Sequence, residues 1–185
     1  MVLKDLSFLS LLLFVFLVGI VFMQVFNAVP VFYKEHLLID ENLIGLLMAL
    51  NGVLVVLLEL PFIHLYENKD KLKLIALGAI LLGISYLILL YDKWAGIAVL
   101  SMIIFSIGEI LTLPFITTTI INRASDSLRG RYLALYGMTF SISHIVAPVL
   151  GMQIADNFGF QVLWIVAGLI ALLSGIGFLR LTKRI

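Results

Sequence analysis

The chain has 185 residues, of which 63% are hydrophobic and 12% are charged, and its formal net charge is +1. Soluble domains carry about 25% charged residues, so this composition excludes an ordinary soluble domain and predicts a polytopic membrane protein. The sequence has no cysteine and no HExxH, GxSxG, P-loop or GxGxxG pattern, and we therefore expect no enzyme, cofactor, metal site or nucleic-acid partner.

Six long apolar runs follow one another and are separated by short polar joints. They cover residues 6–33, 43–66, 72–91, 94–122, 132–155 and 160–181. A helix needs about 20 apolar residues to cross a hydrocarbon core about 30 Å thick, and a backbone inside lipid must form its own hydrogen bonds. The runs therefore predict one all-α domain over residues 1–185, with six transmembrane helices in the lipid bilayer.

Lysine and arginine are divided unevenly between the two sides of such a bundle. If the N-terminus is cytoplasmic, two basic residues, Lys34 and Lys93, lie outside and ten lie inside. The inner set is Lys4, Lys69, Lys71, Lys73, Arg123, Arg129, Arg131, Arg180, Lys183 and Arg184. Because basic residues favour the cytoplasmic side, we expect both termini inside, in a bacterial inner membrane.

The stretch 97–122 of the fourth run carries one carboxylate, Glu109, near its middle. An ionisable group at bilayer depth costs several kcal/mol unless it faces the bundle interior, pairs or takes up a proton. Glu109 is therefore a candidate for proton coupling or for recognition of a charged substrate. It can equally be a protonated glutamate packed between helices, or one that points to water. His144, at similar depth, is a candidate proton relay or partner for Glu109, or a structural histidine.

Further polar side chains lie within the runs. Gln24 and Asn27 in the first run and Asn51 in the second are candidates to line a central cavity, or to join helices by hydrogen bonds. Thr112 and Tyr136 complete the candidate lining.

The second half of the chain repeats features of the first. The first and fourth runs each carry a polar residue followed by a proline, Asn27 with Pro30 and Glu109 with Pro114. Aligning the prolines of the second and fifth runs brings Ala76–Leu82 beside Ala167–Leu173 with a small gap. The two triplets of helices start on opposite sides of the membrane. This pattern predicts an inverted 3+3 repeat, which in transporters places substrate sites near the midplane.

The segment 125–164 contains Arg129-Gly-Arg-Tyr132 near its start, an Ala147-Pro-x-x-Gly151 step, and Asp156-x-x-Gly159 before Trp164. With these motifs it resembles the drug-efflux branch of the major facilitator superfamily. The resemblance covers nearly the whole chain and implies the C-terminal six-helix half of a twelve-helix transporter. It further implies alternating access with proton-coupled efflux of a small molecule, with a second six-helix bundle as partner.

Two charged joints are candidates for the inner gate of such a transporter. They contain Glu67, Lys69, Lys71 and Lys73 after the second run, and Arg123, Asp126, Arg129 and Arg131 after the fourth. Anchoring of arginine on the cytoplasmic side explains the second joint equally well. Two other functions remain open: a six-helix membrane scaffold without transport, and a half-size transporter that acts as a homodimer.

Overall fold

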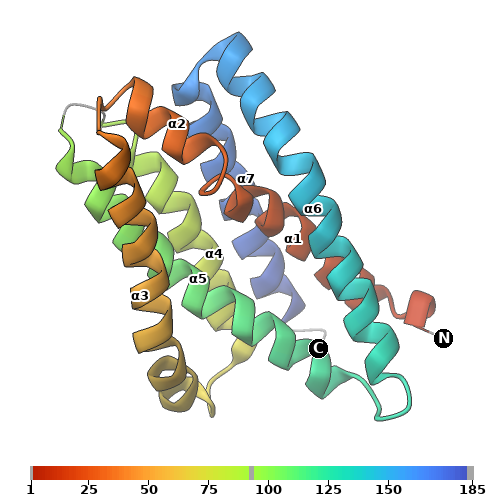
Figure 1. Cartoon of the computed structure of the whole chain (residues 1–185). Helices are drawn as coiled ribbons and strands as arrows, with labels where there is room; N and C mark the ends of the chain where they lie inside the picture. The colour runs from red at the N-terminus through yellow and green to blue at the C-terminus, as the bar shows by residue number, and fades with distance from the viewer. Residues whose placement is uncertain (1, 92–93, 183–185) are drawn as a thin grey trace.

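The computed structural model describes residues 2–91 and 94–182, and Figure 1 shows them as helices joined by short turns. The helices are η1 (Val2–Lys4), α1 (Leu6–Met23), α2 (Ala28–Glu35), α3 (Glu41–Tyr66), α4 (Lys71–Ile88), α5 (Gly96–Arg123), α6 (Arg129–Phe158) and α7 (Phe160–Leu181). Six spans are long and apolar enough to cross a membrane, with α1 and α2 together forming the first. The prediction of an all-α bundle with six transmembrane helices is confirmed. Lys93, Lys183 and Arg184, which entered the charge count, lie outside the described residues.

Short polar residues fix where several helices begin. The Asp40 carboxylate accepts hydrogen bonds from the backbone amides of Asn42 and Leu43 at the start of α3. Asp70 does the same at the start of α4. These are N-caps, which satisfy amides that have no partner inside the helix. Between α6 and α7 the chain turns at Gly159, whose φ of +87° is readily adopted only by glycine.

The first span is not the single helix that the apolar run predicts. It breaks at residues 24–27 into α1 and α2 (Figure 1). Pro30, in the first turn of α2, has no amide to bond the carbonyl of Phe26, so the helical ladder lacks one hydrogen bond there. The carbonyl of Gln24 accepts from the amides of Ala28 and Val29, and the Asn27 side chain donates to the Met23 carbonyl at 2.7 Å. These bonds satisfy the Met23 and Gln24 carbonyls at the break.

The packing of the helices agrees with the predicted inverted repeat. The second helix of the first triplet, α3, packs on α5, and the second helix of the second triplet, α6, packs on α1. The third helices, α4 and α7, pack on each other. Each triplet thus makes the same kind of contact with the other. The start of α1 and the end of α7 lie toward the same end of the bundle as the turns after α3 and α5 (Figure 1).

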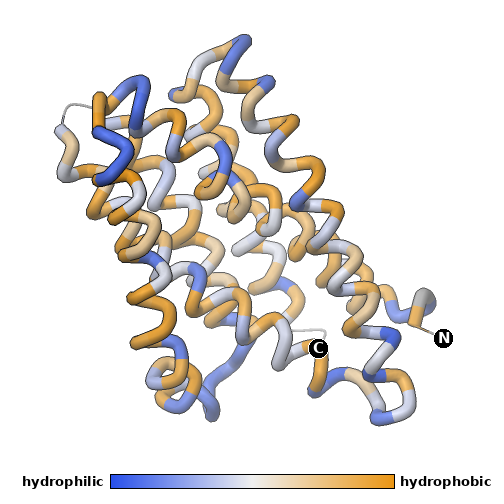
Figure 2. Tube along the Cα trace, viewed as in Figure 1, coloured by the Kyte–Doolittle hydropathy of each residue, from blue (hydrophilic) through white to orange (hydrophobic). Residues whose placement is uncertain are grey.

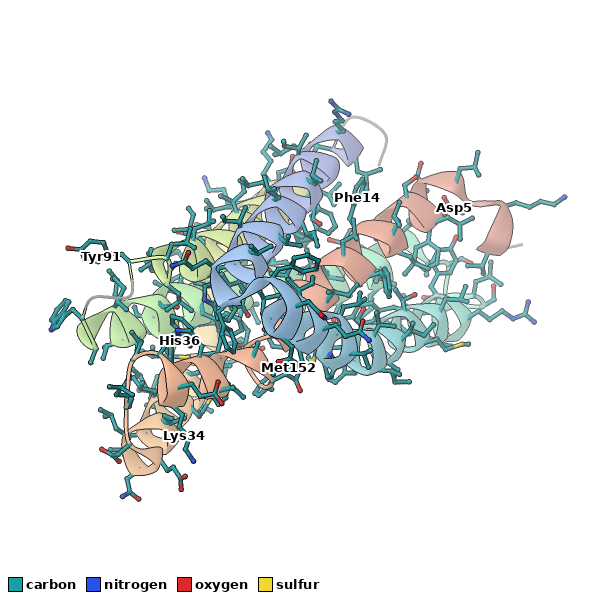
Figure 3. All side chains as sticks on the ribbon, turned by 90° about the horizontal axis from the view of Figure 1, so that it is seen from above. Asp5, Phe14, Lys34, His36, Tyr91 and Met152 are labelled. Carbon is teal, nitrogen blue, oxygen red and sulfur yellow. The ribbon has the colours of Figure 1, made fainter. Side chains whose placement is uncertain are left out.

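Small residues and aromatic rings bring the core helices together. A Cβ on Gly78 of α4 would lie 2.2 Å from the hydroxyl of Thr112 on α5, so this crossing requires glycine. Phe14 of α1 packs over Gly177 of α7 (Figure 3). Tyr86 stacks on Trp164, with ring centroids 5.4 Å apart, and both side chains are fully buried.

The helices α3 and α6 are packed on one side only. In their most apolar windows 11% of the residues are buried, against half or more in the other spans. Their exposed apolar side chains include Leu46, Val53, Val56, Leu57 and Leu60 on α3, and Met138, Ile142, Ile145 and Val149 on α6. Figure 2 shows apolar residues along the length of both helices, mixed with polar residues on α6. These faces are suited to contact with lipid or with another apolar protein surface.

Candidate functional site

The carboxylate of Glu109 on α5 is held by a side chain from α3. Asn51 donates from Nδ2 to Glu109 Oε2 at 2.9 Å and to Ser106 Oγ at 3.1 Å. Ser106 and Glu109 are three residues apart, which places them on one face of α5. Ser106 in turn donates to the carbonyl of Met102 at 2.8 Å. The two predicted residues Asn51 and Glu109 are thus brought together, with Ser106 as a third member that the sequence analysis missed.

This Asn51–Ser106–Glu109 cluster is closed on one side and partly open on the other. Asn51 is 9% exposed and Ser106 is fully buried, whereas Glu109 is half-buried. Glu59 lies eight residues after Asn51 on α3, about 12 Å farther along the same helix. A carboxylate such as that of Glu109 is a group that can bind a proton or a cation. Oxygen atoms of carboxylate, amide and hydroxyl groups are also the ligands that hard metal cations prefer.

The other predicted lining residues lie apart from this cluster. Thr112 is fully buried, donates to the Gly108 carbonyl and faces Gly78 in the α4–α5 contact. Tyr136 on α6 is half-buried and lies beside Thr117 of α5. Neither forms a hydrogen bond with Glu109 in the part of the chain that the structure describes.

The two amides of the first span bond mainly to backbone. Gln24 is buried and donates from Nε2 to the Ala147 carbonyl of α6 at 3.0 Å and to the Ile20 carbonyl at 3.2 Å. Its Oε1 has no hydrogen-bond partner within residues 2–91 and 94–182. Asn27 bonds to its own helix, as described above. Gln24 therefore joins α1 to α6, which matches the helix-joining alternative.

His144 is exposed on α6 and does not lie with Glu109. Its Nδ1 is 3.1 Å from the carbonyl of Phe140 in the same helix, and the two rings meet edge to face. Among the described residues, no hydrogen bond or ion pair joins His144 to Glu109. The structure therefore does not show the predicted pair.

The candidate gate residues lie at one end of the bundle, in the turns after α3 and α5. Arg129 pairs with Asp126 at 2.7 Å, and Arg131 is exposed. In the other turn Lys73 pairs with Asp70 at 3.5 Å and Glu67 with His64 at 3.7 Å, while Lys69 is exposed and Lys71 half-buried.

Arg123 is engaged in a cluster that the sequence analysis did not predict. It donates two hydrogen bonds to Asp5, at 2.6 and 2.7 Å, and Tyr132 donates a third at 2.9 Å. Asp5 also accepts from the Phe8 amide as the N-cap of α1. The guanidinium of Arg123 is the main cause that lowers the pKa of Asp5 from 3.8 to about 2. This Asp5 clasp joins the start of α1, the end of α5 and the start of α6.

Comparison with known proteins identifies the family. The sequence model described as Major Facilitator Superfamily matches residues 11–184. The chain belongs to this superfamily. It is 28% identical to a "Na(+), Li(+), K(+)/H(+) antiporter" of Planococcus maritimus, over 96% of this chain and 45% of that protein. It is 25% identical to the "Uncharacterized MFS-type transporter YqjV" of Bacillus subtilis, over 84% of this chain and 38% of that protein.

A second Bacillus subtilis protein, the "Uncharacterized MFS-type transporter YttB", is 26% identical over 83% of this chain and 39% of its own length. The chain therefore spans less than half the length of these relatives. Membership places the chain in a superfamily of membrane transporters, in agreement with its six apolar spans.

Proposed function

We propose that this chain forms one half of a secondary transporter that exchanges a cation for protons at Glu109. The observation that carries the proposal is the Asn51–Ser106–Glu109 cluster, which holds one carboxylate between two membrane-spanning helices and leaves part of it open. Such ionisable residues mark ion pathways and proton relays because their burial is costly. The antiporter of Planococcus maritimus supports exchange of this kind.

A single six-helix bundle supplies one wall of a central cavity, so alternating access needs a second bundle. The apolar faces of α3 and α6 are suited to that contact, and the relatives are more than twice as long as this chain. The second bundle is an N-terminal half or another copy of the chain. The two bundles rock about Glu109, which releases a proton on one side of the membrane and a cation on the other.

The charged turns after α3 and α5 form the inner gate in this proposal, with both termini in the cytoplasm. Arg131 and Lys69 are exposed and can pair with acidic groups of the second bundle when the cavity faces outward. Tyr136 lies on α6 toward α5 and remains a candidate for the cavity wall.

Two classes of cargo fit the acidic site. Carboxylate, amide and hydroxyl oxygens suit Na⁺, Li⁺ or K⁺, in line with the printed name of the antiporter. An organic cation is the second class, because exposed apolar side chains of α3 such as Val53 and Val56 can contact an apolar body. The resemblance of residues 125–164 to the drug-efflux branch supports this second class.

Everted membrane vesicles that contain the complete transporter test the proposal. Respiration acidifies the vesicle interior, and a pH-sensitive dye reports proton release after addition of NaCl, LiCl, KCl or ethidium. We expect at least one of these cations to release protons, and Glu109→Gln to abolish the response. The matched control is Glu41→Gln, an exposed acid at the start of α3. A cation-dependent response in Glu109→Gln equal to that of the unmodified protein would remove Glu109 from the mechanism.

A second measurement separates transport from a scaffold role. The mass of the detergent-solubilised chain, with and without the N-terminal half, reports whether twelve helices assemble. A chain that stays monomeric under both conditions contradicts the two-bundle transporter.

A further inference from the structure

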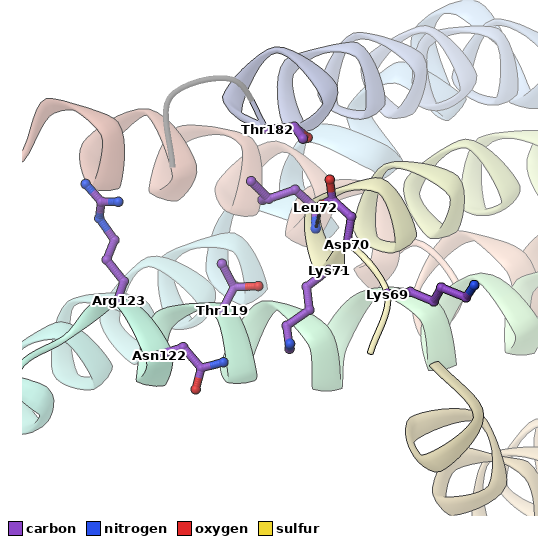
Figure 4. A pocket seen from close by; sticks show the side chains of 8 residues that line it. All are labelled: Lys69, Asp70, Lys71, Leu72, Thr119, Asn122, Arg123 and Thr182. Carbon is purple, nitrogen blue, oxygen red and sulfur yellow. Dashed lines mark hydrogen bonds between the residues drawn. The ribbon is translucent and has the colours of Figure 1, made fainter. Parts of the chain in front are cut away.

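An open cavity of about 600 Å³ lies at the end of the bundle that carries the charged turns (Figure 4). It is bordered by the start of α4, the end of α5 and the residue that follows α7. The residues used below are Lys69 and Lys71 near the start of α4, Thr119 and Asn122 on α5, and Thr182 after α7. Thr119 lies ten residues after Glu109, about 15 Å along the helix. The cavity is therefore separate from the Glu109 cluster.

The carboxylates near this cavity already pair with groups of the protein itself. Asp70 accepts from the amides of Leu72 and Lys73, and it pairs with the Lys73 ammonium group. Arg123, which also borders the cavity, is balanced by Asp5. The acidic groups therefore leave the remaining positive charges of the cavity unbalanced.

Those positive charges are the ammonium groups of Lys69 and Lys71. Lys71 makes one long bond, 3.5 Å, to the Glu67 carbonyl. Lys69 and the Asn122 amide have no side-chain hydrogen bond or ion pair within the described residues. Thr182 donates at 3.5 Å to the Phe178 carbonyl. The cavity thus presents hydrogen-bond donors and two positive charges without a matching acceptor.

We propose that this cavity binds a phosphate group that carries net negative charge. The Lys71 ammonium group and the Asn122 amide offer donors to phosphate oxygens, and Lys69 adds a second positive charge nearby (Figure 4). Basic pockets between helix ends at a membrane surface bind the headgroups of anionic lipids, and a soluble phosphate offers the same chemistry. A bound phosphate ties the start of α4 to the end of α5. The proposal does not depend on the cargo at Glu109.

The test is native mass spectrometry of the purified protein in detergent at low salt. The protein is titrated with dioctanoyl phosphatidylglycerol, with dioctanoylglycerol, which lacks the phosphate, and with inorganic phosphate. We expect phosphatidylglycerol to bind and dioctanoylglycerol not to bind. The variant Lys69→Gln/Lys71→Gln should bind about 25-fold more weakly, from about fivefold per lysine at a membrane surface.

Two variants control for folding and for overall charge. Lys69→Arg/Lys71→Arg keeps the charges and should retain binding. Lys4→Gln/Lys34→Gln removes two exposed positive charges outside the cavity and should leave the affinity within about twofold of the unmodified protein. If inorganic phosphate binds and loses affinity in Lys69→Gln/Lys71→Gln, while phosphatidylglycerol does not bind, the ligand is a soluble phosphate compound. Equal affinity of Lys69→Gln/Lys71→Gln and unmodified protein, or no binding of either phosphate compound, overturns the proposal.

Discussion

The substitution Asp5→Asn should loosen the end of the bundle where the Asp5 clasp joins α1, α5 and α6. Asparagine has nearly the same size as aspartate and is an equally good N-cap, so the bond from the Phe8 amide can remain. The substitution removes the negative charge of Asp5, to which Arg123 donates two hydrogen bonds. The substitution therefore isolates the ion pair from the capping of α1.

The size of the effect follows from the pKa of Asp5, which the clasp lowers from 3.8 to about 2. A difference of this size corresponds to about 2.4 kcal/mol at neutral pH. Water screens part of it, because the side chains of Asp5 and Arg123 remain 19% and 21% exposed. We therefore expect Asp5→Asn to lower the free energy of unfolding by about 1–2 kcal/mol, or the melting temperature by about 2–8 °C.

The pH dependence has a definite sign. The pKa of Asp5 is lower in the folded protein than in the unfolded chain. The ionised carboxylate therefore makes its full contribution to the free energy of unfolding above about pH 5, and this contribution is lost as the pH falls through 3.8 toward 2. The unmodified protein and Asp5→Asn should therefore differ at pH 7, differ about half as much at pH 3, and converge near pH 2.

Thermal unfolding in detergent, followed by tryptophan fluorescence, measures these differences. The matched control is Asp126→Asn, which removes a carboxylate that is 92% exposed and paired with Arg129. It should change the melting temperature by less than 2 °C, which is about 0.5 kcal/mol. Equal melting temperatures for Asp5→Asn and unmodified protein at pH 7, or a difference that persists near pH 2, would refute the assignment of this stability to the ion pair.

Two glycine substitutions test the helix packing by the same melting measurement. Gly78→Ala should destabilise by about 1–3 kcal/mol, because its Cβ would lie 2.2 Å from the Thr112 hydroxyl, whereas Gly52→Ala has no atom within 4 Å and should be neutral or stabilising. A loss of stability in Gly52→Ala as large as in Gly78→Ala would contradict this. Gly151→Ala should also destabilise, since its Cβ would lie 2.1 Å from Gln24 Oε1. Gly151→Ala should lower the melting temperature less when Gln24→Ala is also present. If the effects of the two substitutions on stability were strictly additive, a clash between the new Cβ and Gln24 would be contradicted.

The number of spans and most helix ends could be predicted because hydropathy and capping residues act locally. The break in the first span could not be predicted from hydropathy, since Val25, Phe26 and Ala28 keep that segment apolar. Pro30 is visible in the sequence, but Pro61, Pro114 and Pro148 lie inside continuous helices, so a proline alone does not predict a break. A proline removes a hydrogen bond without changing hydropathy.

The site could be predicted in part. Counting residues along a helix gives the depth of a side chain but not the direction in which it points, which depends on the rotation of each helix against its neighbours. The sequence analysis named Asn51 and Glu109 separately and offered His144 as the partner of Glu109, whereas the structure shows that Asn51 donates to Glu109. Thr112, at nearly the same depth as Glu109, points into the α4–α5 contact. The Asp5 clasp joins residues 118 positions apart, and such a contact has no local signal.

In the predicted repeat Glu109 of the second half corresponds to Asn27 of the first half, and the two side chains differ in the hydrogen bonds that they can form. Asn27 has a donor and bonds back to the Met23 carbonyl, at a break in the backbone. An ionised glutamate has no donor, so Glu109 cannot satisfy a carbonyl of its own helix. The helix α5 continues through Pro114, and the carboxylate takes its hydrogen bond from Asn51 on α3. The carboxylate of Glu109 can take up a proton or carry a negative charge, which the neutral amide of Asn27 cannot.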